Sequence, residues 1–548
     1  MSRVPTRWLT AAVAGLAAGS SFTSLRNGFA LDDIPIILRN PAVHVLSAPW
    51  AYFTTTYWPA DAGPALYRPL TVLGFALQWA AGDGAPLPFH LASIVLYAAA
   101  ALAIFWLARQ LLPPIAAFGA AALFAVHPVH VEAVANVVGQ PEIIVGLLIP
   151  LALGWYLRAR NAGPLGARDI VGIGSLYAVA LCFKEHALVL PALLVLAECL
   201  VVREPIEGPV RVRRLLPVFL ALVATLVVFW TVRTTVTGGL VGRDIHPAFR
   251  DGLVSTRLLT ALGVIPEYMR LLLFPVHLSA DYNPQQIPVL TTFDPRAATG
   301  LFLLAAFVAI AWWTRRRAPV VAFGILWIGV TLFPVSNLLL PTGILLAERT
   351  LFLPSVGMVL AVCGIAEHLQ PTRPGAPAAR QVLAAGVVAV LVLGGLVRSA
   401  TRQLVWRDNA TLFHQTALDA PLSYKALAAD AVTLFESGQE AAGEQEYRRA
   451  IELYGQDPNV IADLGDWYLG KRRWADALGM YQRVLALVPT HWSATSRSIL
   501  CLINLDRLDD AERLARVAAA RGDRGAEEKL AYVDKLRASR PAVQSTTH

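Results

Sequence analysis

Long apolar runs alternate with short breaks carrying Arg, Pro or Gly over residues 1–400. A helix that crosses a bilayer needs about 20 mainly apolar residues. Eleven runs approach that length, so the sequence predicts an all-α, polytopic membrane domain of about eleven transmembrane helices. The runs are Trp8–Leu25, Phe89–Leu111, Ile115–Val126, Glu142–Leu157, Ile170–Phe183, Ala187–Val202, Leu215–Thr231, Gly300–Thr314, Ala318–Leu338, Leu351–His368 and Gln381–Leu396.

Two segments allow a second interpretation. Trp8–Leu25 follows two arginines, as the apolar part of a signal peptide would, but it ends in SLRNGF without a clean small-residue cleavage site. Leu253–Phe274 is apolar enough to span, yet it contains three charged residues. We therefore expect Leu253–Phe274 to be an interfacial or re-entrant helix on the outer face.

Basic residues predict the orientation of the membrane domain, because Lys and Arg are enriched in cytoplasmic loops. With eleven spans the arginine groups, of which Arg315–Arg317 is the densest, all fall on one side. The two long loops at 26–88 and 232–299 then lie on the outer face. The C-terminal region is expected on that outer side as well.

A different kind of sequence begins near Arg402, where acidic and basic residues become frequent. It fits the 34-residue tetratricopeptide repeat (TPR), which places small and aromatic residues at fixed positions. The sequence predicts a membrane domain at 1–400, a connector at 401–423, about three repeats at 424–520, and a helix and tail at 521–548. The first repeat is expected to carry a three-residue insertion before Pro458. The matching residues are Leu427, Ala431, Leu434, Tyr447 and Ala450, then Leu464, Gly465, Tyr468, Ala477, Tyr481 and Pro489, then Leu502, Ala511 and Ala518.

Composition and charge agree with a membrane class. The chain is 56% apolar and 15% charged, whereas soluble proteins are about 45–50% apolar and about a quarter charged. The net charge of +8 comes from arginines grouped between apolar runs, which favours topology signals over a nucleic-acid surface. Four cysteines are too few for a disulfide framework.

The first outer loop carries an acidic pair, Asp32 and Asp33, immediately after an apolar span. A carboxylate at mid-bilayer is costly, so we expect the pair at the water interface. Mutual repulsion should raise the pKa of one carboxyl, which could then act as a general base, with Asp32 the first choice. The alternative is a solvated loop start or a helix cap, which Asp favours.

Further polar residues recur on the predicted outer face. Arg68, Lys184 and Arg349 are candidate phosphate ligands, because Arg and Lys bind phosphate oxygens through charge-assisted hydrogen bonds; contact with lipid headgroups is the alternative. A metal is not predicted, because two neighbouring histidines lack the i, i+4 spacing of a helical pair. The remaining outer-face candidates are His127, His130, Glu132, Glu185 and Glu348.

Seven motifs in fixed order make the chain resemble a known family. They are FALDDIPIILRNPAVH, YRPLTVLGF, FAVHPVHVEAVANVVGQPE, FKEHALVLP, FPVHLSADY, FPVSNLLLPTGILLAERTLFLPSVG and WRDNATLF. Together with the repeats they resemble the transmembrane and tetratricopeptide-repeat protein O-mannosyltransferases of the GT-C glycosyltransferase superfamily.

The resemblance implies an inverting transfer of a sugar, expected to be mannose, from a polyprenyl-phosphate-linked donor to hydroxyl groups of an exported protein. The base of the first outer loop then corresponds to Asp32 and Asp33, and the donor phosphate would contact Lys184 and Arg349, with Arg68 next. The lipid-linked donor is a co-substrate, and no metal or other cofactor is predicted. Expected partners are the donor, an exported polypeptide held by the TPR groove, and membrane lipid, but no nucleic acid.

An Ala- and Arg-rich composition suggests a bacterial homologue in the inner (plasma) membrane, with its repeats on the non-cytoplasmic side. The alternative function is a non-enzymatic membrane scaffold whose TPR domain recruits envelope partners. A transporter would want charges near mid-membrane or internal membrane repeats, and the sequence has neither.

Overall fold

The computed structural model describes residues 5–59, 65–202, 204, 208–239, 245–250, 253–369, 378–522 and 524–538. These ranges contain helices and no strand, as the all-α prediction requires. The chain divides into two units, described separately below. The membrane unit comprises residues 1–283 and 287–419, and the repeat unit comprises residues 284–286 and 420–548.

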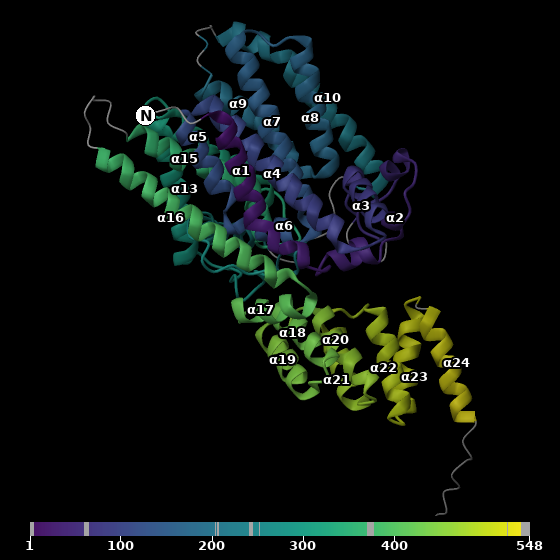
Figure 1. Ribbon diagram of the computed structural model, residues 1–548. Coiled ribbons are helices and arrows are strands. Elements are labelled where there is room, and N and C mark those ends of the chain that lie inside the picture. Colours follow the sequence, from purple (N-terminus) through teal and green to yellow (C-terminus); the bar gives the residue numbers. More distant parts are fainter. Residues whose placement is uncertain are drawn as a thin grey trace, which may run out of the picture. The chain divides into compact units, whose positions relative to one another are not determined.

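Each of the eleven predicted apolar runs overlaps a helix of the membrane unit (Figure 1). They are α1 (Thr6–Ser21), α4 (Pro86–Leu111), α5 (Pro114–Ala125), α7 (Gln140–Ala162), α8 (Ala167–Phe183), α9 (Leu190–Leu200), α10 (Gly208–Thr237), α13 (Pro295–Thr314), α14 (Pro319–Leu332), α15 (Phe352–His368) and α16 (Ala378–Gln403).

The number of full-length spans is smaller than the predicted eleven. In the described residues, length and composition qualify seven helices as spans, or eight if the bent pair Pro114–Ala125 and Pro128–Ala135 counts as one. Three predicted spans fall short because α8, α9 and α14 have 17, 11 and 14 residues. The helix α12 (Val254–Leu273) has 20 residues but is not among the qualifying spans, in agreement with its exclusion from the predicted set.

Close packing of small residues fixes the start of α15, which carries part of the candidate site. A Cβ added to Gly324 of α14 would lie 2.4 Å from the carbonyl oxygen of Gly357 in α15. A Cβ added to Gly146 of α7 would lie 2.3 Å from the ring of Phe352. Glycine at both positions therefore lets α14 and α7 approach α15 closely, as small residues do at membrane helix interfaces.

Short helices and turns form the predicted outer segments. The first outer loop contains η2 (Ile34–Leu38), α2 (Pro41–His44), η3 (Pro49–Thr54) and α3 (Pro69–Gly82). Its buried side chains, among them Ile37, Tyr52 and Phe75, form an apolar cluster together with Phe89 and Val137. Because the loop has this small core, its polar residues are held in defined positions.

Two more short elements matter for the site. The helix α6 (Val131–Ala135) follows α5 after a turn at Pro128–His130, and η8 (Glu348–Leu351) leads directly into α15. At the end of the membrane unit, α17 (Asn409–Asp419) follows α16 through the turn Leu404–Trp406.

The repeat unit consists of three helix pairs and one further helix. The pairs are α18 (Tyr424–Glu436) with α19 (Glu440–Leu453), α20 (Pro458–Gly470) with α21 (Trp474–Leu487), and α22 (Trp492–Asn504) with α23 (Leu508–Ala520), followed by α24 (Arg524–Ala538). The three pairs begin 34 residues apart, so the predicted insertion before Pro458 is wrong: this proline opens α20. A Cβ added to Gly465 would lie 2.9 Å from the ring of Tyr481, which explains the small residue at that repeat position.

Candidate active site

The acidic pair lies on a tight turn that sends its two carboxyl groups in different directions. Asp33 is only 1% exposed, so the prediction that it lies at the water interface is wrong. Its carboxylate accepts hydrogen bonds from the backbone N–H groups of Val138 (2.9 Å), Val137 (3.3 Å) and Ala30 (3.4 Å). Asp33 therefore ties the first outer loop to the segment after α6.

Burial also sets the protonation of Asp33. Removal from water raises the pKa of its carboxyl from 3.8 to about 7, against the three backbone hydrogen bonds, which lower it. The charge of Asp32 raises this pKa as well, but it is the smallest of these contributions. One pKa of the pair is therefore raised, as predicted, but the main cause is burial of Asp33, and repulsion by Asp32 contributes less.

Asp32 is half-buried, and its carboxylate has no hydrogen-bond or ion-pair partner among the residues that the structure describes. Its neighbourhood can be read from Tyr57, a buried residue of the same loop. Burial raises the pKa of the Tyr57 hydroxyl; the positive charges of Arg68 and Arg349 lower it, and the negative charges of Asp32 and Asp33 raise it. The charges of Asp32, Arg68 and Arg349 therefore all act on one buried side chain.

Arg349 is fixed by a buried carboxylate of α6. Its backbone N–H donates to Oε2 of Glu132 at 2.8 Å, and its guanidinium forms an ion pair with Oε1 of the same residue. The side chain of Glu132 is 2% exposed. A guanidinium has five N–H donors in a fixed fork, so Arg349 keeps donors for a second anion.

Lys184 has an equivalent arrangement. Its ammonium group forms an ion pair with Glu142, a buried residue in the first turn of α7. Burial lowers the pKa of Lys184, and the charge of Glu142 opposes this, while the nearby charges of Arg68 and Arg349 lower it further. The three cations of the predicted phosphate site therefore influence one another.

Arg68 completes the set. Its Nε lies 3.2 Å from Oε2 of Glu185, and its guanidinium lies 4.9 Å from the centre of the Tyr57 ring. Arg233, at the end of α10, approaches the same carboxylate, with 4.0 Å between its Nε and Oε1 of Glu185. Glu185 therefore pairs with Arg68, a predicted phosphate ligand, and also lies near Arg233, which was not predicted.

The two candidate histidines serve the fold. Nε2 of His127 lies 3.0 Å from the carbonyl oxygen of Leu272. His130 is hydrogen-bonded at both ring nitrogens, to the Tyr97 hydroxyl at 2.9 Å and the Ser355 hydroxyl at 2.8 Å. No group of three or more His, Cys, Asp or Glu residues within the described ranges is arranged to hold a metal ion.

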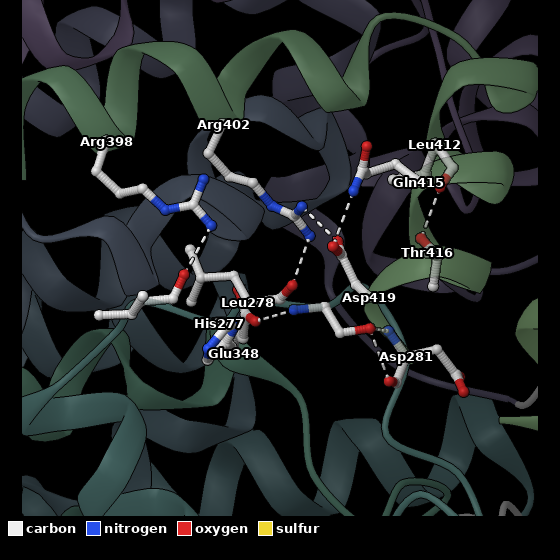
Figure 2. A network of polar contacts seen from close by, with 12 residues as sticks. His277, Leu278, Asp281, Glu348, Arg398, Arg402, Leu412, Gln415, Thr416 and Asp419 are labelled. Atoms are coloured by element: carbon white, nitrogen blue, oxygen red, sulfur yellow. Dashed lines mark hydrogen bonds and ion pairs between the residues drawn. The ribbon is translucent and has the colours of Figure 1, made fainter. Parts of the chain in front are cut away.

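Glu348 lies beside the loop after α12 (Figure 2). Its Oε1 accepts hydrogen bonds from the backbone N–H of Ser279 at 2.6 Å and from the Tyr282 hydroxyl at 2.7 Å. Glu348 therefore holds this loop.

Sequence reasoning missed Glu142, Tyr57 and Arg233. Glu142 was visible as a lone carboxylate at the edge of an apolar run, and Arg233 as a lone cation at the end of another. Intramembrane charges of this kind usually have a partner and a function. The sequence carried no signal for Tyr57, since its role depends on the folding of the first outer loop.

The fold and this cluster define a class: an integral, multi-pass helical membrane protein with a charged cluster in the loops of its membrane unit and a C-terminal helical repeat. No family model matches the chain. It is 25% identical to protein O-mannosyl-transferase TMTC3 of Mus musculus over 515 residues, 87% of this chain and 54% of that protein. It is 26% identical to protein O-mannosyl-transferase Tmtc3 of Drosophila melanogaster, with 91% of this chain and 62% of that protein covered.

A shorter match is more similar. Over 310 residues the chain is 34% identical to protein O-mannosyl-transferase Tmtc2 of Drosophila melanogaster, which covers 54% of this chain and 32% of that protein. The chain spans about half the length of the curated relatives it matches. These relatives are TMTC protein O-mannosyl-transferases, so the resemblance based on the ordered motifs is confirmed.

Proposed function

We propose that the chain is a membrane glycosyltransferase that transfers a sugar, expected to be mannose, from a polyprenyl-phosphate-linked donor to hydroxyl groups of an exported protein. The observation that carries this proposal is the Asp32 carboxylate, which has no partner among the described residues and whose charge acts on Tyr57 together with those of Arg349 and of Arg68, which lies 4.9 Å from the Tyr57 ring centre. The names of the relatives support the same reaction class.

The chemistry needs a base and a site for a departing phosphate. Asp32 removes the proton from the acceptor hydroxyl, whose oxygen attacks the anomeric carbon of the donor sugar. The bond from that carbon to the phosphate oxygen breaks, and its electron pair leaves with the polyprenyl phosphate. Arg349, Lys184 and Arg68 stabilise the negative charge on this leaving group.

A single displacement of this kind inverts the anomeric configuration. A phosphate leaves as an anion without protonation, so one carboxylate base is sufficient. Glycoside hydrolysis differs, since it uses two separated carboxyl groups, one of them an acid. Asp33, which is buried and accepts three backbone hydrogen bonds, supports the turn and leaves Asp32 as the base.

We place the repeats on the outer side of a bacterial inner membrane, where an exported acceptor would arrive. The course of the chain within the membrane unit supports this placement. Connector residues contact the turn that carries Asp32, through the hydrogen bond from Gly28 N–H to the Arg407 carbonyl at 2.8 Å. The chain therefore leaves the membrane unit on the side of the candidate site.

The test of the enzymatic proposal is Asp32→Asn, assayed with purified protein, a polyprenyl-phosphate sugar and an acceptor peptide. Loss of a general base should lower the kcat of the variant about 10²–10⁴-fold and leave its melting temperature unchanged. The product of the wild-type enzyme should have the inverted anomeric configuration. The matched control is Asp83→Asn, an exposed aspartate of the same outer loop, which should retain wild-type kcat. Full activity of Asp32→Asn would refute the assignment and favour a scaffold.

The side of the membrane can be tested separately by cysteine labelling in a variant whose native cysteines are replaced. Ser47 in the first outer loop and Ser437 in the repeat unit are both exposed. Cysteines at both positions should react with an impermeant reagent in intact cells. Protection of the Ser437 position alone would place the repeats on the cytoplasmic side.

A further inference from the structure

The residue that precedes the proposed base has an unusual backbone conformation. Leu31 has a φ of 53°, in the left-handed region, and is the only apolar residue among the described non-glycine residues with positive φ. This conformation is unfavourable for a residue with a branched side chain and persists where the surroundings impose it. Since Asp32 follows directly, the direction of its carboxylate depends on Leu31 keeping this conformation.

A side chain of the connector provides that restraint. The backbone N–H of Leu31 donates to Oδ1 of Asn409 at 2.7 Å. Asn409 is the first residue of α17 and lies within the WRDNATLF motif, to which the sequence analysis gave no chemical role. It is also half-buried, as expected for a residue in a structural contact.

Other connector contacts with the same turn use backbone atoms or apolar surface. Gly28 N–H donates to the Arg407 carbonyl, and the Asn27 side chain donates to the Gln403 carbonyl, both at 2.8 Å. Ala30 packs in a buried cluster with Trp406 and Leu412. Asn409 therefore contributes a side-chain polar contact to the turn of Asp32.

The far end of the connector is also fixed within the membrane unit. Arg402 forms an ion pair with Asp419 and donates to the Leu278 carbonyl at 3.0 Å, while Gln415 donates to Asp419 at 2.9 Å (Figure 2). These contacts hold α17 at its C-terminal end as Asn409 holds it at its start. The connector is therefore a braced element between the repeats and the acidic turn.

We propose that Asn409 is a positioning residue for Asp32: its side-chain oxygen holds Leu31 in the left-handed conformation and so aims the carboxylate at the acceptor hydroxyl. This inference rests on the proposed function. It assigns the connector a role in the chemistry as well as in attachment of the repeats.

The primary variant is Asn409→Ala, which removes the acceptor of the Leu31 N–H. If Leu31 relaxes and Asp32 turns away, kcat should fall about ten- to hundredfold, as for other small misplacements of a catalytic group. The donor KM should be unchanged, because the cations lie on other elements. The matched control is Leu418→Ala, which shortens an exposed side chain of the same helix outside these bracing contacts and should keep wild-type kcat.

A rescue experiment separates positioning from general stabilisation. Glycine adopts positive φ without steric cost, so Leu31→Gly should make the turn less dependent on Asn409. In the Leu31→Gly background, Asn409→Ala should lower kcat less than about threefold. If Asn409→Ala costs as much in that background as in the wild type, Asn409 does not act through Leu31.

Asn409→Asp gives a second readout. The carboxylate can accept the same hydrogen bond, so kcat at its optimum should stay near that of the wild type. A negative charge beside Asp32 should, however, move the acidic limb of the pH–kcat profile to higher pH. An unshifted limb would place Asn409 too far from the base to act on it.

Hydrogen–deuterium exchange of the peptide covering residues 27–36 distinguishes failure of this inference from failure of the proposed function, since it needs no activity. Asn409→Ala should accelerate exchange of this peptide, and Leu418→Ala should not. If Asp32→Asn is inactive while Asn409→Ala exchanges and turns over like the wild type, the positioning role is refuted and the base remains. If Asp32→Asn is fully active, the proposed base itself is refuted.

Discussion

Asp33 allows a sharp prediction, because its substitution by Asn should affect stability in a manner that depends on pH. The wild-type carboxyl is buried and accepts three backbone hydrogen bonds. An Asn side chain has one acceptor oxygen, and its NH₂ group would face N–H donors. Each buried donor left without a partner costs about 1–3 kcal/mol, so Asp33→Asn should be less stable than the wild type at low pH by about that amount.

The pH dependence follows from the raised pKa of Asp33. Its value is about 7 in the folded protein and about 3.9 for an unperturbed Asp. Between these values the unfolded chain is ionised while the folded protein still holds the proton. The folded state then binds more protons than the unfolded state, so stability falls as pH rises through this window.

The size of the effect is about 4 kcal/mol, since one pKa unit corresponds to about 1.4 kcal/mol. This stabilisation is fully present below pH 4 and is lost by about pH 8. The Asn variant has no titrating group at this position. The stability gap between the two proteins should therefore close with rising pH, and the variant should be at least as stable as the wild type at pH 8.

Thermal unfolding in detergent, followed through the 14 tryptophans of the chain, measures the gap between pH 4.5 and 8. Other ionisable groups cancel in the comparison because both proteins contain them. Asp83→Asn serves as the control, since Asp83 is exposed and does not contribute to the pKa shift of Asp33, and it should show a small gap that does not vary with pH. A gap for Asp33→Asn that widens with pH would mean that Asp33 is ionised in the folded protein and would refute this account.

Three further predictions concern the neighbouring groups. Glu132→Gln leaves Arg349 with a neutral partner, so the melting temperature should fall and donor KM should rise; an unchanged melting temperature would argue against a structural ion pair. Gly139→Ala places a Cβ 2.4 Å from the Ala133 carbonyl oxygen and should destabilise the protein by about 1–3 kcal/mol in denaturant titrations. The stability of this variant should also depend less on pH than that of the wild type, because the contacts of Asp33 with the neighbouring backbone shift. A chain ending at Asp419 should bind donor with wild-type affinity and show a raised KM for long acceptors only. A chain ending at Thr416 also lacks the Asp419 partner of Arg402, so its melting temperature should be lower. Equal melting temperatures of the two chains would contradict the bracing role of that ion pair.

The helices and the repeat period could be predicted because they are local properties. Each of the eleven apolar runs located a helix of the membrane unit, seven or eight of which qualify as spans in the described residues, and small and aromatic residues indicated the 34-residue period. Helix length was less accessible: the break at Lys184–His186 separates α8 from α9, and the charges there were visible, but the resulting short helices were not. Span counts from apolarity alone therefore exceeded the number that full length supports.

The site could be predicted only in its composition. Asp32, Arg68, Lys184 and Arg349 were selected by type and by place in outer loops. The burial of Asp33 depends on amides of Val137 and Val138, about a hundred residues away in the chain. No periodicity encodes such a contact, so adjacent residues that look equivalent in the sequence have different environments in the fold.

The pairing of the cations follows from the cost of isolated charge near a membrane. An unpaired cation that is partly removed from water is unfavourable, and three within one site would also repel. Glu132, Glu142 and Glu185 each neutralise one of them, which leaves Asp32 as the carboxylate without a partner among the described residues. A phosphate entering such a site meets N–H donors that are already oriented, and the acceptor hydroxyl meets a carboxylate that is not engaged elsewhere. The difference between paired and unpaired carboxylates, more than the number of charges, therefore distinguishes the residues that hold the candidate site from the proposed base.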